Sequence, residues 1–220
     1  MLNNLLFIRM PRCASASLKT FCDIHKIDYV GGTDYGFWGG SLSNRLKYKF
    51  TPYCLSKRIL IDYGTKKFNE KFKFTSVRNP YSRALSIWRH DSFSKIHTFT
   101  EFCKCLNSQS FPSARAKWHA SASADHVFTE GELRVDCVLK VESLVTDLSN
   151  CMHPFGISID QISEFFDANP RIDNSIKLLS DEKSTMTLDS AYVSSFERDS
   201  VRKFYAKDFE TFGYSEEVFW

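Results

Sequence analysis

The amino-acid sequence predicts an α/β fold with helices flanking a central, mostly parallel sheet. Three short apolar runs have the length of buried strands, and segments with apolar residues at helical spacing follow them along the chain. Strands that alternate with helices are typical of a parallel sheet covered by helices. No repeat or interdomain linker interrupts this pattern, so we expect one domain over residues 1–220.

The first strand is expected at residues 5–10, an apolar run that stops at Pro11 because proline has no backbone N–H donor. A helix is expected from about Ser15, since apolar residues recur there at helical spacing. These residues are Ala14, Leu18, Phe21 and Cys22. Five glycines between residues 31 and 40 end the pattern and predict a loop.

A second strand and helix are expected from residue 72 onward. Residues 72–77 alternate as a strand does, and Asn79-Pro80 then supplies an N-cap and a proline for the first helical position. That helix has one apolar face and an opposite polar stripe. The apolar face consists of Tyr81, Leu85 and Trp88. The polar stripe consists of Ser82, Ser86, Arg89 and His90. The remaining elements are a third strand at residues 135–141 and helices near residues 143–150, 160–167 and 189–210.

The charge balance argues against a protein that coats nucleic acid, because 29 Lys and Arg residues are nearly matched by 26 Asp and Glu residues. Basic residues do concentrate between Arg45 and Lys73. A solvated face is the expected explanation for this cluster, and a surface for an anionic substrate is the alternative.

The seven cysteines leave at least one thiol unpaired, and several lie in apolar runs, which favours a reducing compartment and a cytoplasmic location. Cys103 and Cys105 have no second Cys or His pair at zinc-ribbon spacing, so we expect no metal site. The first residues contain too short an apolar run for a signal sequence, and no run is long enough for a membrane helix.

Residues 11–18, PRCASASL, have the composition of an anion-binding turn. Small side chains let backbone N–H groups approach a phosphate closely, and the helix N-terminus adds donors and a positive dipole. The small residues are Ala14, Ser15, Ala16 and Ser17. Ser17 can add a hydroxyl donor and Arg12 a planar cationic fork. A plain strand-to-helix turn is the alternative, and the motifs of P-loop NTPases and dinucleotide-binding proteins are missing.

Residues 72–90 carry a second candidate anion site. Arg78 lies at the end of the expected strand, and Ser86 lies two turns into the following helix, so both can face one phosphate. The alternatives are a surface arginine at a strand terminus and a solvated helix serine.

These segments together resemble the sulfotransferases that use 3'-phosphoadenosine 5'-phosphosulfate. PRCASASL is similar to their 5'-phosphosulfate loop, P-K-T-A-G-T-S-L, and residues 77–86, VRNPYSRALS, are similar to their 3'-phosphate signature, V-R-[DN]-P-x-x-R-x-x-S. Residues 118–148 resemble the family's H-x-x-P-Q segment and the strand and helix after it. Residues 204–214, FYAKDFETFGY, resemble its C-terminal Y-x-x-D-[FL]-x-x-F-G-Y. The resemblance is to the branch that includes heparan- and chondroitin-type carbohydrate sulfotransferases and many stand-alone bacterial enzymes.

The resemblance implies a P-loop-like three-layer domain, a nucleotide donor, a hydroxyl acceptor on a carbohydrate and no metal. It implies that Arg12 contacts the 5'-phosphate and the bridging oxygen of the donor, and that Ser17 holds the 5'-phosphate. The loop residues between them, Cys13, Ala14, Ser15 and Ala16, would line the same site. Arg78 and Ser86 match the pair that grips the 3'-phosphate.

The chain also departs from the family pattern. Arg12 stands where the family has lysine, and Cys13, Ser15 and Ala16 replace Thr, Gly and Thr. A general base is needed for the acceptor hydroxyl, yet no histidine lies between His25 and His90, where relatives often carry one.

The position of the usual base falls near Phe50. Asp62, Glu70 or a tyrosine could replace it, and His119, at the start of the third family segment, is the histidine we assign to catalysis. A structural role for His119 is the alternative. Two other functions stay open: a catalytically silent nucleotide- or glycan-binding protein with this fold, and a P-loop kinase.

Overall fold

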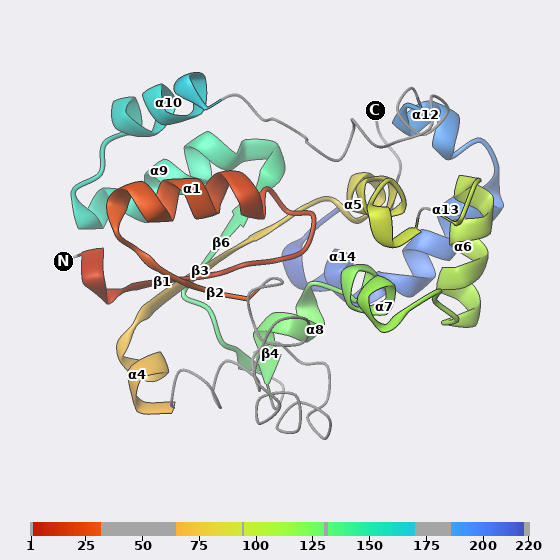
Figure 1. Ribbon diagram of the computed structural model, residues 1–220, viewed down its shortest axis with the longest axis horizontal. Helices are drawn as coiled ribbons and strands as arrows, with labels where there is room; N and C mark the ends of the chain where they lie inside the picture. The colour runs from red at the N-terminus through yellow and green to blue at the C-terminus, as the bar shows by residue number, and fades with distance from the viewer. Residues whose placement is uncertain (1, 32–64, 94, 130–131, 170–185, 218–220) are drawn as a thin grey trace. The chain divides into compact units, whose positions relative to one another are not determined.

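The computed structural model describes five stretches of the chain, namely residues 2–31, 65–93, 95–129, 132–169 and 186–217 (Figure 1). They belong to two compact units. Unit 1 comprises Met1–Val77 and Asp125–Arg171, and unit 2 comprises Arg78–Ala124 and Ile172–Trp220. The sequence predicts a single domain, and the contacts within the chain divide its residues between these two units.

Unit 1 is built on a parallel sheet of four strands in the order β2-β1-β3-β6. The strands are β1 (Leu5–Ile8), β2 (Asp28–Val30), β3 (Phe72–Val77) and β6 (Cys137–Lys140). The register places Phe7 opposite Phe74 on the neighbouring strand. The three strands expected from the apolar runs are therefore present, and the prediction of an α/β fold with a parallel sheet is confirmed.

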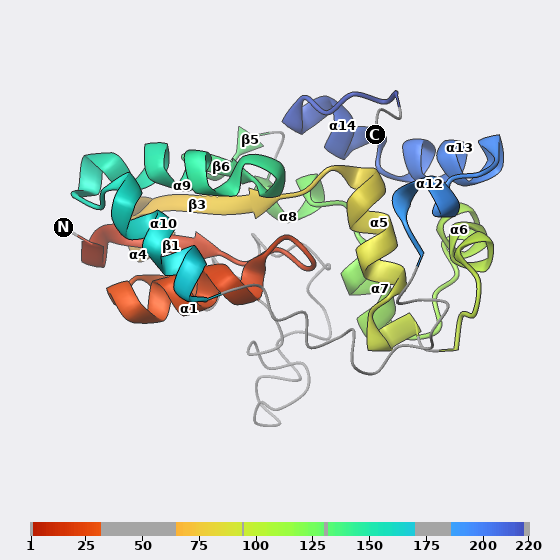
Figure 2. The same cartoon turned by 90° about the horizontal axis from the view of Figure 1, so that it is seen from above.

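One face of this sheet is covered by α1 (Ser15–His25) and α9 (Leu144–Met152), and α10 (Ile159–Ala168) packs on these helices farther from the sheet, as Figure 1 shows. Figure 2 shows α9 over the β6 side of the sheet and α1 over the β1 side. The buried side chains between sheet and helices form one apolar cluster, in which the rings of Phe7 and Phe74 stack 5.1 Å apart. Burial of this cluster supplies the main driving force for folding unit 1.

The other elements of unit 1 are short. They are η1 (Leu2–Asn4), α4 (Thr65–Glu70), η3 (Val141–Ser143), η4 (His153–Phe155) and an antiparallel pair, β4 (Phe128–Thr129) with β5 (Glu132–Leu133). The four-residue helix α8 (Ala124–Val127) begins at the last residue of the first segment of unit 2.

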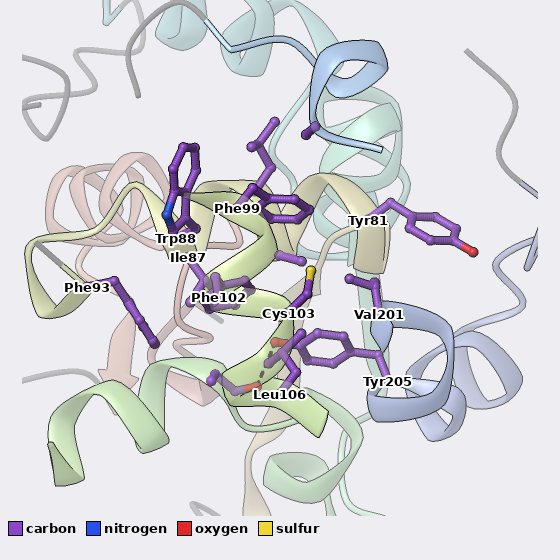
Figure 3. Packing of buried hydrophobic residues seen from close by; sticks show 14 of the residues in the cluster. Tyr81, Ile87, Trp88, Phe93, Phe99, Phe102, Cys103, Leu106, Val201 and Tyr205 are labelled. Atoms are coloured by element: carbon purple, nitrogen blue, oxygen red, sulfur yellow. Dashed lines mark hydrogen bonds between the residues drawn. The ribbon is translucent and has the colours of Figure 1, made fainter. Parts of the chain in front are cut away.

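In the described residues of unit 2, all regular elements are helices, which loops connect. Its elements are α5 (Pro80–Trp88), η2 (Asp91–Phe93), α6 (Phe99–Ser108), α7 (Ala114–Ala120), α12 (Leu188–Ala191), α13 (Ser195–Phe204) and α14 (Ala206–Phe212). Aromatic side chains from α5, η2 and α6 fill its core together with Val201 of α13 and Tyr205 (Figure 3). Trp88 lies edge-on to Phe99 at 5.7 Å, a geometry that aromatic pairs prefer.

The stretch expected to be helical near residues 189–210 is mostly helical, and the structure divides it into α12, α13 and α14. The Ser194 hydroxyl accepts a hydrogen bond from the backbone N–H of Phe196, and Glu197 completes a capping box. Such a cap starts a new helix. Tyr205, with φ −103° and ψ 20°, separates α13 from α14.

Candidate functional site

The turn between β1 and α1 has an unusual backbone. Arg12 and Ala14 both adopt the left-handed conformation, with φ values of 62° and 55°. A residue with a Cβ pays roughly 1–2 kcal/mol for this conformation. Strained residues of this kind cluster at ligand-binding sites, where the surrounding structure holds them in place.

Strand β3 provides that support. The Ser76 hydroxyl donates a hydrogen bond to the backbone carbonyl of Cys13, and the Thr75 hydroxyl donates to the carbonyl of Ile8 at 2.8 Å. The Cys13 thiol is fully buried and donates to the carbonyl of Pro11 at 3.4 Å. The Cys13 thiol is therefore enclosed by the protein and does not face solvent.

The first turn of α1 presents backbone donors beside this loop. The first N–H groups of a helix have no carbonyl within the helix to bond, so they are available to an anion at the N-terminus. In this turn Ser15 and Ser17 are half-buried, and Ala16 is exposed. Arg12 is also half-buried, and its guanidinium adds a positive charge. The turn can therefore bind a phosphate-like group.

In unit 2, the predicted anion-binding residues lie at the two ends of α5, with Arg78 before its first residue and Ser86 in its last turn. Asn79 caps this helix by accepting from the backbone N–H of Tyr81 at 3.0 Å, and Pro80 occupies the first turn, as predicted. The guanidinium Nε of Arg78 donates to the Ser82 hydroxyl at 3.0 Å. Because Ser86 lies one helical turn beyond Ser82, it shares the face that Arg78 contacts. Arg78 and Ser86 can therefore act on one ligand.

The burial of α5 differs from the sequence prediction. Ser86 retains only 7% of its exposure, so a solvated helix serine is the wrong description. Arg83, between the two predicted faces, is fully buried. The polar stripe predicted for α5 is therefore shielded from solvent at Ser86.

A buried ion pair in unit 2 was not anticipated from the sequence. Arg83 Nη1 lies 3.5 Å from Asp208 Oδ2, and Arg83 Nη2 donates to the carbonyl of Ser121 at 2.8 Å. Asp208 in turn accepts from the backbone N–H groups of Ser123 and Ala124 at 2.9 Å and 2.7 Å. The sequence pointed to these two residues only through the family patterns. Arg83 is the second arginine of the 3'-phosphate signature, and Asp208 is the aspartate of the C-terminal pattern.

These two side chains anchor the segment that follows α7. The Tyr205 hydroxyl adds a hydrogen bond to the carbonyl of Ala120 at 2.8 Å. The small and polar residues at 120–125 suggest a substrate loop in the sequence, but most of this segment is packed. Its buried residues are Ala120, Ala122, Ser123 and Ala124.

His119 lies in the last turn of α7 and is 6% exposed. Its ring lies 4.0 Å from the His90 ring and 4.8 Å from the Trp118 ring, measured between centroids. Of the other positions considered for a base, Phe50 and Asp62 lie outside the described residues, and Glu70 is exposed at the end of α4.

Comparison with known families identifies the chain. The model of a family described as "Sulfotransferase family" matches residues 3–215, which covers nearly the whole sequence. The chain belongs to the sulfotransferase family. Comparison with curated proteins and with solved structures gives no match. Family membership supports a transferase that moves sulfuryl groups, and the sheet flanked by helices agrees with the fold expected of this family.

The basic cluster of the sulfotransferase lies mostly outside the described residues. Of its described members, Lys66 and Lys67 lie in α4, and Lys71 and Lys73 form ion pairs within unit 1. Lys71 lies 3.1 Å from Asp28, and Lys73 lies 3.0 Å from Asp136. These two lysines thus have structural partners close to the sheet.

Within the described parts of the sulfotransferase, no group of three or more His, Cys, Asp and Glu residues could hold a metal ion. Also within them, no helix is long and apolar enough to cross a membrane.

Proposed function

We propose that this sulfotransferase moves the sulfuryl group of 3'-phosphoadenosine 5'-phosphosulfate to a hydroxyl group of a carbohydrate. The observation that carries the proposal is the strained turn at Arg12 and Ala14. This turn lies at the N-terminus of α1 and is held by a hydrogen bond from Ser76 of β3. Such a turn suits a phosphate-like group. A second cation-and-hydroxyl pair, Arg78 and Ser86, suits a second phosphate, and the donor has phosphates on both sides of its nucleoside.

In unit 1, the turn would receive the 5'-phosphosulfate. The N–H groups of the first turn of α1 and the Ser17 hydroxyl would bind the 5'-phosphate, and Arg12 would stabilise the negative charge that grows on the leaving phosphate oxygens. A guanidinium can bind two oxygens at once, whereas the family's ammonium is a compact point charge. Arg12 would therefore act by electrostatic stabilisation rather than by proton transfer.

In unit 2, Arg78 and Ser86 would bind the 3'-phosphate, the group that distinguishes this donor from ATP. The Ser82 hydroxyl holds the Arg78 guanidinium at the start of α5. A preoriented guanidinium loses less side-chain entropy when it binds an anion. We further propose that both units belong to one domain over residues 1–220. We also propose that His119 removes the proton of the acceptor hydroxyl.

Calorimetry on the parent chain and on Arg78→Ala and Ser86→Ala variants tests the donor assignment. The parent should bind 3',5'-bisphosphoadenosine, and each variant should lose about 1.5–3 kcal/mol of that affinity while changing little towards adenosine 5'-phosphate. Arg202→Ala, at an exposed arginine of the same unit, is the matched control. Equal losses for the two nucleotides would remove Arg78 and Ser86 from the 3'-phosphate site.

A transfer assay separates the enzyme from the other two functions. Donor is incubated with a panel of glycans and small alcohols, and sulfated product is measured. Binding of bisphosphoadenosine without transfer to any acceptor would favour a silent binding protein. A kinase would instead be stabilised by ATP with Mg²⁺, by about 2.7 kcal/mol at 100 times the dissociation constant.

A further inference from the structure

Two cysteines of unit 1, Cys137 and Cys151, are brought together by a strand that is followed by an antiparallel helix. Cys137 is the first residue of β6, and Cys151 lies in the last turn of α9. The chain advances by roughly 13 Å along four strand residues and returns by roughly 10 Å along seven helical residues. The start of β6 and the end of α9 therefore meet at one end of the sheet, where Figure 1 shows α9 alongside β6.

Both side chains belong to the apolar cluster between the sheet and its helices. Cys151 is 6% exposed, whereas Cys137 is half-buried and reachable from solvent. A hydrogen bond from the Cys151 thiol to the Cys137 sulfur lowers the pKa of Cys137 and raises the pKa of Cys151. The two side chains therefore lie next to each other where α9 packs on β6, and the less buried one has the lowered pKa.

Cys22, Cys103 and Cys105 lack this combination. Burial raises the pKa of Cys22 and of Cys103, and both are enclosed by the core. Cys105 is half-buried, and burial raises its pKa as well. Cys103 and Cys105 lie two residues apart in α6, so their side chains point to different sides of the helix. Since the thiolate is the reactive form of cysteine, oxidants should react first at Cys137.

We propose that Cys137 and Cys151 are a dithiol modification site at which hydrogen peroxide forms an intramolecular disulfide. The Cys137 thiolate attacks one peroxide oxygen, the O–O bond breaks, and hydroxide leaves, so Cys137 becomes a sulfenic acid. The Cys151 sulfur then attacks the Cys137 sulfur, the S–O bond breaks, and water leaves with the Cys151 proton. Peroxide is reduced and the two thiols are oxidised by two electrons. The bond would link the end of α9 covalently to the edge strand of the sheet.

Peptide mapping tests the proposal on the unmodified full-length chain. Trypsin places Cys137 alone on residues 135–140 and Cys151 alone on residues 141–171, and it separates Cys103 from Cys105. After treatment with peroxide and alkylation of the remaining thiols, we expect these two peptides to be joined, and a reductant to release them. Alkylation of both cysteines after peroxide treatment, or linkage of either to a different cysteine, would overturn the proposal.

Three variants test the order of the steps. Cys151→Ser keeps a hydroxyl donor beside Cys137, so Cys137 should stay reactive and should accumulate as a sulfenic acid that dimedone traps. Cys151→Ala removes the donor, so alkylation of Cys137 should need a higher pH than in the serine variant. Cys105→Ser, at a half-buried thiol of the other unit, should keep the cross-link. Loss of the cross-link in Cys105→Ser, or equal pH profiles for the two Cys151 variants, would contradict the assigned roles.

Discussion

The Ser76 hydroxyl in β3 donates a hydrogen bond to the backbone carbonyl of Cys13, between two residues in the left-handed conformation. Through this contact the central sheet holds the strained turn that precedes α1. The neighbouring hydroxyl, that of Thr75, makes a similar contact with β1 at Ile8 rather than with the turn. The Ser76 hydroxyl therefore supports the turn, whereas the Thr75 hydroxyl supports the pairing of β3 with β1.

We expect Ser76→Ala to weaken the binding of 3',5'-bisphosphoadenosine by about 1 kcal/mol, or roughly fivefold, because the turn loses its anchor. Thr75→Val removes an equally buried hydroxyl bond but leaves the turn attached. It should lower the melting temperature without a matching loss of affinity. Calorimetry and thermal unfolding of both variants measure the two effects, and an equal loss of affinity in both would show that Ser76 acts only through stability.

Replacement of Arg12 should impair transfer more than donor binding, because the charge that it stabilises grows in the transition state. Arg12→Ala should lower kcat by about 10²-fold, and Arg12→Lys should retain activity or raise it. Arg9→Ala is the control, since Arg9 is a nearby half-buried cation whose Nη1 donates to the carbonyl of Gly31 at 3.4 Å. A lysine variant that binds donor but is as inactive as the alanine variant would refute the match between Arg12 and the family's lysine.

The buried pair of Arg83 and Asp208 should contribute strongly to the stability of unit 2. Asp208→Asn leaves the Arg83 guanidinium buried without its counter-charge, so the free energy of unfolding should fall by about 3–5 kcal/mol. Asp199→Asn breaks an exposed pair with Arg202 in the same unit and should cost about 0–1 kcal/mol. Urea unfolding measures both values. Similar small losses would mean that water or a neighbouring group compensates the Arg83 charge.

If His119 is the general base, His119→Ala should lower kcat by about 10²- to 10⁴-fold and leave donor affinity nearly unchanged. The acidic limb of the pH–rate profile should also flatten, since the titrating group is gone. His119→Phe distinguishes catalysis from packing, because phenylalanine keeps a ring against His90 and Trp118. Full activity in the phenylalanine variant would make His119 structural, and Asp62 and Glu70 would be tested next.

Local signals in the sequence predicted several elements correctly. Proline at position 11 and the small residues after it marked the turn before α1, and Asn79-Pro80 marked the start of α5. These signals work because capping and the fixed φ of proline act within a few residues. The same local reasoning predicted helix at residues 189–210 but did not reveal that a new helix begins after Ser194.

The order of apolar runs and helical segments in the sequence determined the α/β class of this protein and the segments that match the sulfotransferase family. Only the tertiary structure decided that Ser86 is buried, that Arg83 meets Asp208, and that Ser76 supports the turn at Cys13. These contacts join residues far apart in the chain. Their energies depend on burial and on the distance between groups, and neither quantity is encoded in the spacing of residues along a single segment.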